Sequence, residues 1–138
     1  MQRMLVDDTR AFLDRSREPR AYARGLSRVG GRLLDELHGH HHIEDDHYFP
    51  LLQTFDPRIA AGFDLLEADH QALGAAMQEL AQAANAVLRA LDEGAAADLA
   101  AGGLDTTLAG FGRLLDRHLV DEEELVVPVI LDHPEAGL

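Results

Sequence analysis

Two segments of the chain combine histidine and carboxylate side chains at a spacing that suits a metal ion. His40 lies four residues before Glu44, and His118 lies four residues before Glu122. On a helix, side chains four residues apart share one face, about one turn from each other. Each segment can therefore present a ring nitrogen and a carboxylate, both good ligands for transition metals, to the same place.

The two segments also match each other beyond these pairs. Both follow the pattern H-x-x-x-E-acid-acid-x-x-x-P, which ends at Pro50 in one and at Pro128 in the other. A chance match between two solvated, acidic helix ends is the alternative, but apolar neighbours such as Leu37 and Leu119 favour burial against a core. Two buried carboxylates are costly unless cations compensate them. Arg117 is the only positively charged residue near Glu44 or Glu122 in sequence, so we expect a metal ion to supply the compensating charge.

A third candidate ligand is His70, which lies among leucines at helical spacing. A single histidine on an apolar face is more often a satisfied core residue than a ligand, but the two matching H-x-x-x-E segments favour the ligand here. The chain contains no cysteine, which excludes disulfides, thiolate metal sites and thiol nucleophiles. The metal must therefore be held by nitrogen and oxygen ligands.

The elements that position these residues are predicted to be helices, because alanine and leucine dominate and aromatic residues make up only 5%. Gly94 is expected to end the third helix, and residues 95–103 to form a connection with a loosely wound turn. The sequence predicts one all-α domain over residues 1–138, a four-helix up-down-up-down bundle. The predicted helices cover 3–16, Pro19 to Phe49, Asp56-Pro57 to about Asp92, and Leu104 to about Leu131, with Pro134 beyond the last.

The charge balance bears on partners and location. With a formal net charge of −13, the surface repels nucleic-acid phosphates and anionic lipid headgroups, so neither nucleic acid nor membrane is an expected partner. No apolar run approaches the roughly 20 residues of a membrane span. The N-terminal residues are acidic where a signal peptide would be hydrophobic. We expect a cytoplasmic protein.

The stretches LHGHHHIEDDHYFP, LLEADHQAL and RHLVDEEELVVP together resemble the haemerythrin-like, or HHE cation-binding, family. This resemblance implies a four-helix bundle with two non-haem irons, with His40, His70 and His118 as terminal ligands and with Glu44 and Glu122 as bridges. It also implies a protein that binds or senses dioxygen, nitric oxide or peroxide, or that handles iron. The other classes are a catalase-like di-iron enzyme that consumes peroxide, and an interaction module that has lost its metal.

The first helix departs from that family, which takes a further histidine there, because residues 1–37 contain none. The chain could begin just after that histidine, water could take its place, or another side chain could replace it. Loading with two irons can therefore be incomplete. The candidate replacements are Gln2, Asp7, Asp8, His41 and His47.

The remaining polar residues near the motifs have lesser expected roles. Adjacent helical residues point about 100° apart, so His41 and His42 are expected to face solvent or to support the ligands. His47 could line the face of His40 two turns further on, and His133 is expected to be inert. An uncovered apolar face of the first helix could form a homodimer. The residues expected to be solvated or to orient ligand imidazoles are Asp45, Asp46, Glu123 and Glu124.

Overall fold

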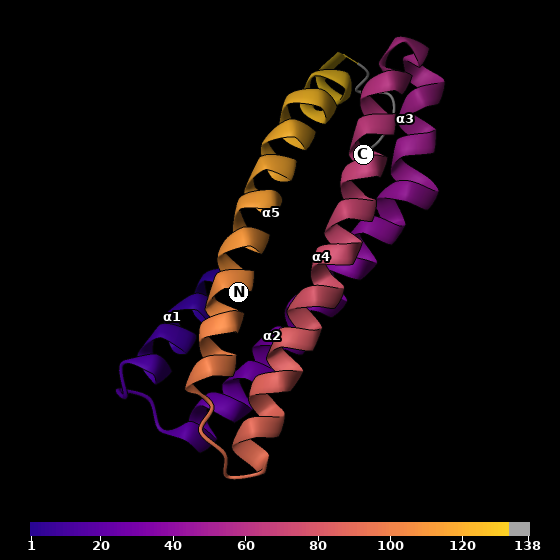
Figure 1. Ribbon diagram of the computed structural model, residues 1–138. Helices are drawn as coiled ribbons and strands as arrows, with labels where there is room; N and C mark the ends of the chain where they lie inside the picture. Colours follow the sequence, from indigo (N-terminus) through magenta and orange to yellow (C-terminus); the bar gives the residue numbers. More distant parts are fainter. Residues whose placement is uncertain (133–138) are drawn as a thin grey trace.

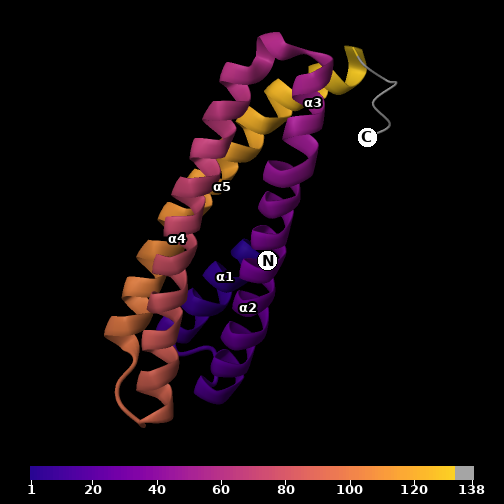
Figure 2. The same cartoon turned by 90° about the vertical axis from the view of Figure 1, so that its right-hand side faces the viewer.

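The computed structural model describes residues 1–132, without the side chains of Phe55 and Arg58, and it is all-α over that range. The bundle consists of four helical rods that alternate in direction (Figures 1 and 2). The first, third and fourth rods are α1, α4 and α5, and the second is continuous through α2, η1 and α3. The predicted four-helix bundle is confirmed, while His133 and Pro134 lie outside the described residues. The elements are α1 (Gln2–Leu13), α2 (Pro19–Ile43), the π-turn η1 (Glu44–Tyr48), α3 (Phe49–Phe55), the 3-10 turn η2 (Pro57–Ile59), α4 (Ala60–Asp92) and α5 (Asp98–Asp132).

Two helix ends follow directly from the local sequence. α2 begins at Pro19, as predicted, and the side chain of Glu18 accepts hydrogen bonds from the backbone N–H groups of Arg20 and Ala21 at 3.0 and 2.9 Å. α4 ends at Asp92 and is followed by Gly94, whose φ of +69° only glycine adopts without strain. Both predictions are confirmed.

Other boundaries differ from the sequence-based expectation. α1 ends at Leu13 because Arg15 adopts a positive φ of 62° and closes the helix with a hydrogen bond to the carbonyl of Phe12. Pro57 begins the short turn η2, and α4 itself starts three residues later. α5 already starts at Asp98, because the small side chains of Ala97 and Ala101 are buried in the core.

The π-turn η1 shifts the buried face of the second rod by one residue. Glu44 is buried, and a regular helix would place Tyr48 on the same face four residues later. The wider turn instead brings Phe49 inward and leaves Tyr48 exposed. The rod then continues to Phe55, beyond its predicted end.

The apolar core is divided into two clusters that lie at different heights in the bundle. The larger cluster includes residues of all four rods, among them Leu5, Leu33, Leu73 and Phe111. The smaller cluster is formed by Phe49, Leu52, Phe63, Leu66 and Val129. In the rod formed by α2, η1 and α3, and likewise in α4 and α5, the predicted metal ligands lie in sequence between residues of one cluster and residues of the other.

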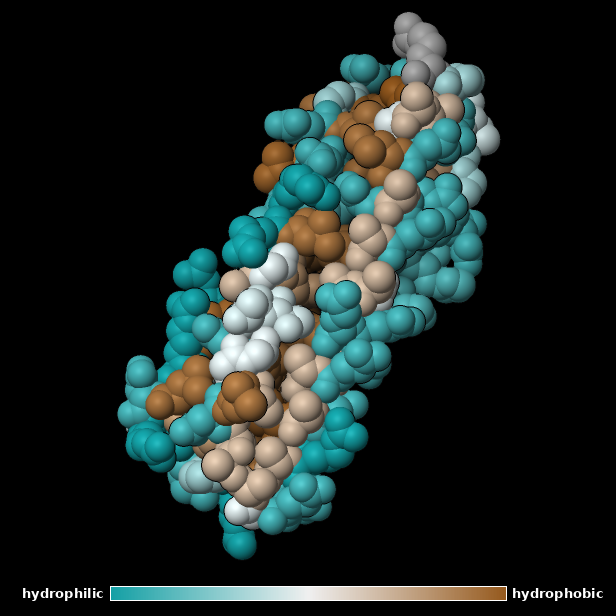
Figure 3. All heavy atoms as spheres, viewed as in Figure 1, coloured by the Kyte–Doolittle hydropathy of each residue, from teal (hydrophilic) through white to brown (hydrophobic). Residues whose placement is uncertain are grey.

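α1 covers only part of the bundle. It runs beside the first half of α5, where Arg15 pairs with Asp98 at 3.2 Å and the side chain of Gln2 donates to the carbonyl of Leu108 at 3.0 Å (Figures 1 and 2). Further along α5, several large apolar residues are exposed, and Figure 3 shows apolar atoms at the surface of that half of the molecule. No described helix is both long and apolar enough to span a bilayer. The exposed residues of this part of α5 are Leu119, Val120, Val127 and Leu131.

Candidate metal centre

The structure brings the five predicted ligands together in the layer between the two apolar clusters. His118 Nε2 lies 3.2 Å from Glu122 Oε2, and His70 Nε2 lies 3.6 Å from Glu44 Oε2. The Nε2 atom of His40 contacts Glu44 Oε1 and lies 4.0 Å from Glu122 Oε1. Glu44, His70 and His118 are buried, Glu122 is partly buried, and the side chain of His40 is 57% exposed. The centre therefore has a buried side and a solvent edge.

His70 and His118 face each other in an arrangement that can hold a cation between their rings. Their Nε2 atoms are 3.1 Å apart. On the far side of each ring, His70 Nδ1 lies 2.9 Å from Asp45 Oδ1, and His118 Nδ1 lies 3.3 Å from Asp69 Oδ2. When the ring proton is on Nδ1, toward the aspartate behind the ring, each Nε2 of a neutral ring presents a lone pair. Two facing lone pairs repel unless a proton or a metal ion lies between them, and carboxylates that orient histidines in this way are common around protein-bound metals.

The two glutamates add to the same requirement. Three of their carboxylate oxygens, both of Glu44 and Oε2 of Glu122, are buried without a hydrogen-bond partner among the described residues. Burial and the nearby Glu122 raise the pKa of Glu44 far above its ordinary value. Arg117, the nearest arginine in sequence, lies 4.0 Å from Asp69 instead of pairing with either glutamate. A metal ion between these oxygens would supply the missing positive charge.

A second proton on the His118 ring can supply part of this positive charge. Burial opposes ionisation of this ring, but the contacts with Glu122 and Asp69 outweigh burial and raise the pKa of His118. For Glu122, burial is likewise outweighed, and the contacts with His118 and Glu44 lower its pKa. The donor set of imidazole nitrogens and carboxylate oxygens therefore fits a transition metal that displaces protons when it binds.

Comparison with known proteins agrees with this chemistry. The family model described as the hemerythrin HHE cation binding domain matches residues 1–134. The chain belongs to the hemerythrin HHE cation-binding domain family. No curated protein and no solved structure matches the chain. Membership implies that this HHE domain binds metal cations. The cluster of histidines and glutamates described above offers ligand atoms of the type that such cations need.

In this HHE domain, His41 is buried, so facing solvent, the first of its two expected roles, is wrong, while a role in supporting the ligands stays a prediction. The residue is 6% exposed, and its ring stacks on His70 with ring centroids 4.1 Å apart and lies 5.5 Å from the ring of His118. Burial and the neighbouring histidines lower the pKa of His41 to about 4, so the ring is neutral. The spacing of the core leucines contained the signal, because His41 follows the buried Leu33 by eight residues and the partly buried Leu37 by four.

The other candidate replacements for the missing histidine do not reach the centre of the HHE domain. His47 is exposed and contacts the ring of Tyr48. From α1, Gln2 is bonded to the backbone of Leu108, Asp8 lies 3.9 Å from Arg17, and Asp7 is exposed.

The acidic residues beside the ligands divide into two groups. Asp45 faces the outer nitrogen of His70, as expected of a residue that orients a ligand, whereas Asp46 is exposed and pairs with His42 at 3.0 Å. Glu123 and Glu124 lie on α5 beyond Glu122, and both are exposed, as expected of solvated residues. Asp69 was missed by sequence reasoning, since its role depends on contact between α4 and α5. His70 and His118 thus each have a carboxylate from a different helix behind the ring.

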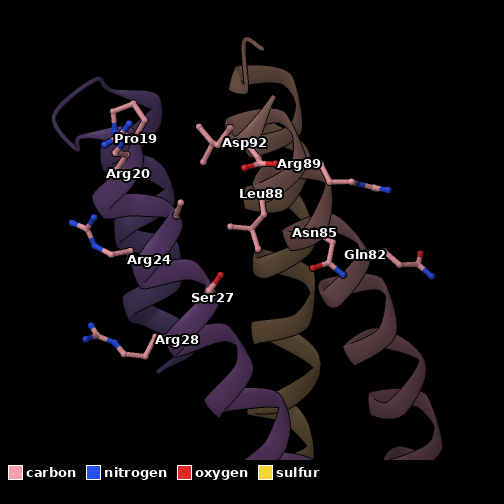
Figure 4. A pocket seen from close by; sticks show the side chains of 12 residues that line it. Pro19, Arg20, Arg24, Ser27, Arg28, Gln82, Asn85, Leu88, Arg89 and Asp92 are labelled. Atoms are coloured by element: carbon pink, nitrogen blue, oxygen red, sulfur yellow. The ribbon is translucent and has the colours of Figure 1, made fainter. Parts of the chain in front are cut away.

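The large groove of the HHE domain is separate from this centre. It has a volume of about 1290 Å³ and lies between the first turns of α2 and the last turns of α4. Figure 4 shows Ser27 and Leu88 facing the groove, while Arg24 and Arg28 point away from it. Arg28 precedes His40 by twelve residues, about 18 Å along a helix. The groove therefore plays no part in holding the metal.

Proposed function

We propose that this HHE domain holds two non-haem irons and uses them to bind or sense dioxygen, nitric oxide or peroxide. The ligands in this proposal are His40, Glu44, His70, His118 and Glu122. The observation that carries it is the 3.1 Å approach of the Nε2 atoms of His70 and His118, each ring being backed by a carboxylate.

The residues of the chain divide the work around such a centre. Asp45 and Asp69 hold the rings of His70 and His118 in one orientation and keep the proton on Nδ1. Glu44 and Glu122 offer their carboxylates from two different helices, so together they can serve two ions. Iron bound there would supply a redox-active centre with open coordination positions for a small molecule.

Packing around the centre favours a small ligand that arrives from one side. The apolar clusters on either side exclude water along the bundle axis, and the ring of Phe49 stacks on His70 with centroids 5.7 Å apart. The solvent edge at His40 is open, since α1 covers a different part of α5. A diatomic molecule or peroxide can approach there, whereas the close spacing of the buried side chains leaves little room for a larger substrate.

Metal analysis combined with visible spectroscopy tests this proposal. Protein purified in air should contain close to two irons per chain and absorb in the visible range, with bands that change on adding azide, fade on reduction and return in air. A colourless protein with only trace iron would contradict the proposal and favour an interaction module without metal. Sustained oxygen evolution from peroxide that is lost in Glu44→Ala would identify the catalase-like enzyme instead of a binding protein.

A further inference from the structure

The first helix supplies no ligand from its described position. Its N-terminal residue Gln2 packs against Gly112 of α5 and donates to the carbonyl of Leu108. His118 lies six residues beyond Gly112, which corresponds to about 9 Å along a helix. Among the described residues, an additional imidazole ligand can therefore come only from another helix.

His41 is placed to be that ligand. Its ring, with those of His70 and His118, forms a group in which one nitrogen of each ring lies within 4.8 Å of a nitrogen of the other two. Two ligand nitrogens at ~2.1 Å from one ion are at most about 4.2 Å apart, so small ring rotations bring all three into range. All three histidines are buried, and they come from three different helices.

The surroundings of His41 also leave its ring nitrogens without a hydrogen-bond partner among the described side chains. The ring stacks on His70 and forms no hydrogen bond with any side chain that the structure describes. A neutral ring nitrogen without a hydrogen bond has a lone pair that a metal ion can bind. His42, the next residue, is exposed and pairs with Asp46, so it provides a natural comparison.

We propose that His41 replaces the missing first-helix histidine and makes the centre asymmetric. The inner position is formed by His41, His70 and His118, and the outer position by His40, Glu44 and Glu122. The inner ion, held by three buried imidazoles, binds more tightly and loads first. The outer ion lies at the solvent edge and exchanges with metal in solution. This inference rests on the proposed binding of metal ions by the HHE domain.

The test compares His41→Phe with His42→Phe in the full chain. Phenylalanine keeps an aromatic ring against His70 but offers no ligand nitrogen, so the fold should survive. Each protein is loaded with Fe(II) without oxygen, dialysed briefly against a chelator and analysed for iron. The wild type and His42→Phe should keep about one iron per chain and show a higher melting temperature with iron than without. His41→Phe should lose this retained iron, bind Fe(II) at least about tenfold more weakly, and lose most of the thermal shift.

Cobalt(II) provides a second readout, because its visible bands report on the number and type of ligands. Removal of an imidazole in His41→Phe should change the bands of the first cobalt bound, whereas His42→Phe should leave them as in the wild type. Iron retention, thermal shift and cobalt bands that are all unchanged in His41→Phe would overturn the inference while leaving the proposed metal binding intact. A wild-type protein that binds neither metal would overturn both.

Discussion

Asp69 of α4 and His118 of α5 face each other across the helix interface, with Oδ2 3.3 Å from Nδ1. This contact turns the other nitrogen of His118 toward His70 and Glu122. A residue outside the H-x-x-x-E pattern thus sets the orientation of a ligand inside it.

Asp69→Asn should weaken metal binding without unfolding the protein. The amide keeps the shape of the side chain but removes the charge that stabilises the Nδ1–H form of His118. Loss of such a carboxylate typically costs about 10- to 100-fold in metal affinity. Titration with Fe(II) in the absence of oxygen measures this effect, with Asp46→Asn as the control, because Asp46 is exposed and pairs only with His42. Equal affinities for the two variants would contradict the assigned role of Asp69.

Metal binding should release protons and strengthen as pH rises. Because its pKa is raised, Glu44 stays protonated at pH values above 4.5, the ordinary pKa of a glutamate. His118 likewise stays protonated at pH values above 6.5, the ordinary pKa of a histidine. Both groups must lose their proton to become ligands. Between each ordinary value and the raised one, affinity should therefore increase by up to about tenfold per pH unit for each proton released.

Calorimetry in buffers of different ionisation enthalpy counts the protons that leave on binding. Glu44→Gln has no proton to release at this position, so its count should fall relative to the wild type. A metal affinity that is independent of pH from 5 to 8 would show that neither group titrates on binding.

His118→Ala should abolish iron binding and the stability that iron adds. His118 is fully buried, and its Nε2 atom lies at the meeting point of His70 and Glu122. An ion at 100 times its dissociation constant stabilises the fold by about 2.7 kcal/mol, and this gain should disappear. Thermal melts with and without iron measure it. His47→Ala is the control, since His47 is exposed outside the cluster, and it should retain the full gain.

Arg15→Gly should stabilise the protein. Arg15 adopts a positive φ of 62° at the end of α1, a conformation that costs a non-glycine residue about 1 kcal/mol. Its exposed ion pair with Asp98 contributes little in return. Arg15→Ala removes the charge but keeps the strain, so the difference in unfolding free energy between the glycine and alanine variants isolates the backbone effect. We expect glycine to be more stable by about 1 kcal/mol, and equal stabilities would contradict this.

Much of the fold could be predicted because its signals are local. Pro19 and Gly94 mark a helix start and a helix end by their own backbone preferences, whatever packs around them. The start of α5 could not be read in this way. Ala97 and Ala101 give little signal by themselves and become core residues only through contact with other helices.

The same distinction applies to the metal centre. His40 with Glu44 and His118 with Glu122 were found from spacing within one helix, and the structure brings both pairs together. The burial of His41 depends on which face of α2 packs against the other helices. The repeated H-x-x-x-E motif instead indicated its neighbour His40 as the inward-facing residue. The contact of Asp69 with His118 depends on how α4 and α5 are rotated about their axes, and nothing within one helix encodes that rotation.

The extra residue in η1 separates the register of the metal ligands before it from the packing of the apolar residues after it, which a regular helix would link. One residue corresponds to a rotation of about 100°, so deletion of a residue between Asp45 and Tyr48 would turn Phe49 and Leu52 out of the smaller apolar cluster. His40 and Glu44 precede the deletion and would keep their register with the larger cluster. The sequence that follows the π-turn can therefore vary to improve packing at that end of the bundle while the ligand-bearing turns before it stay in place.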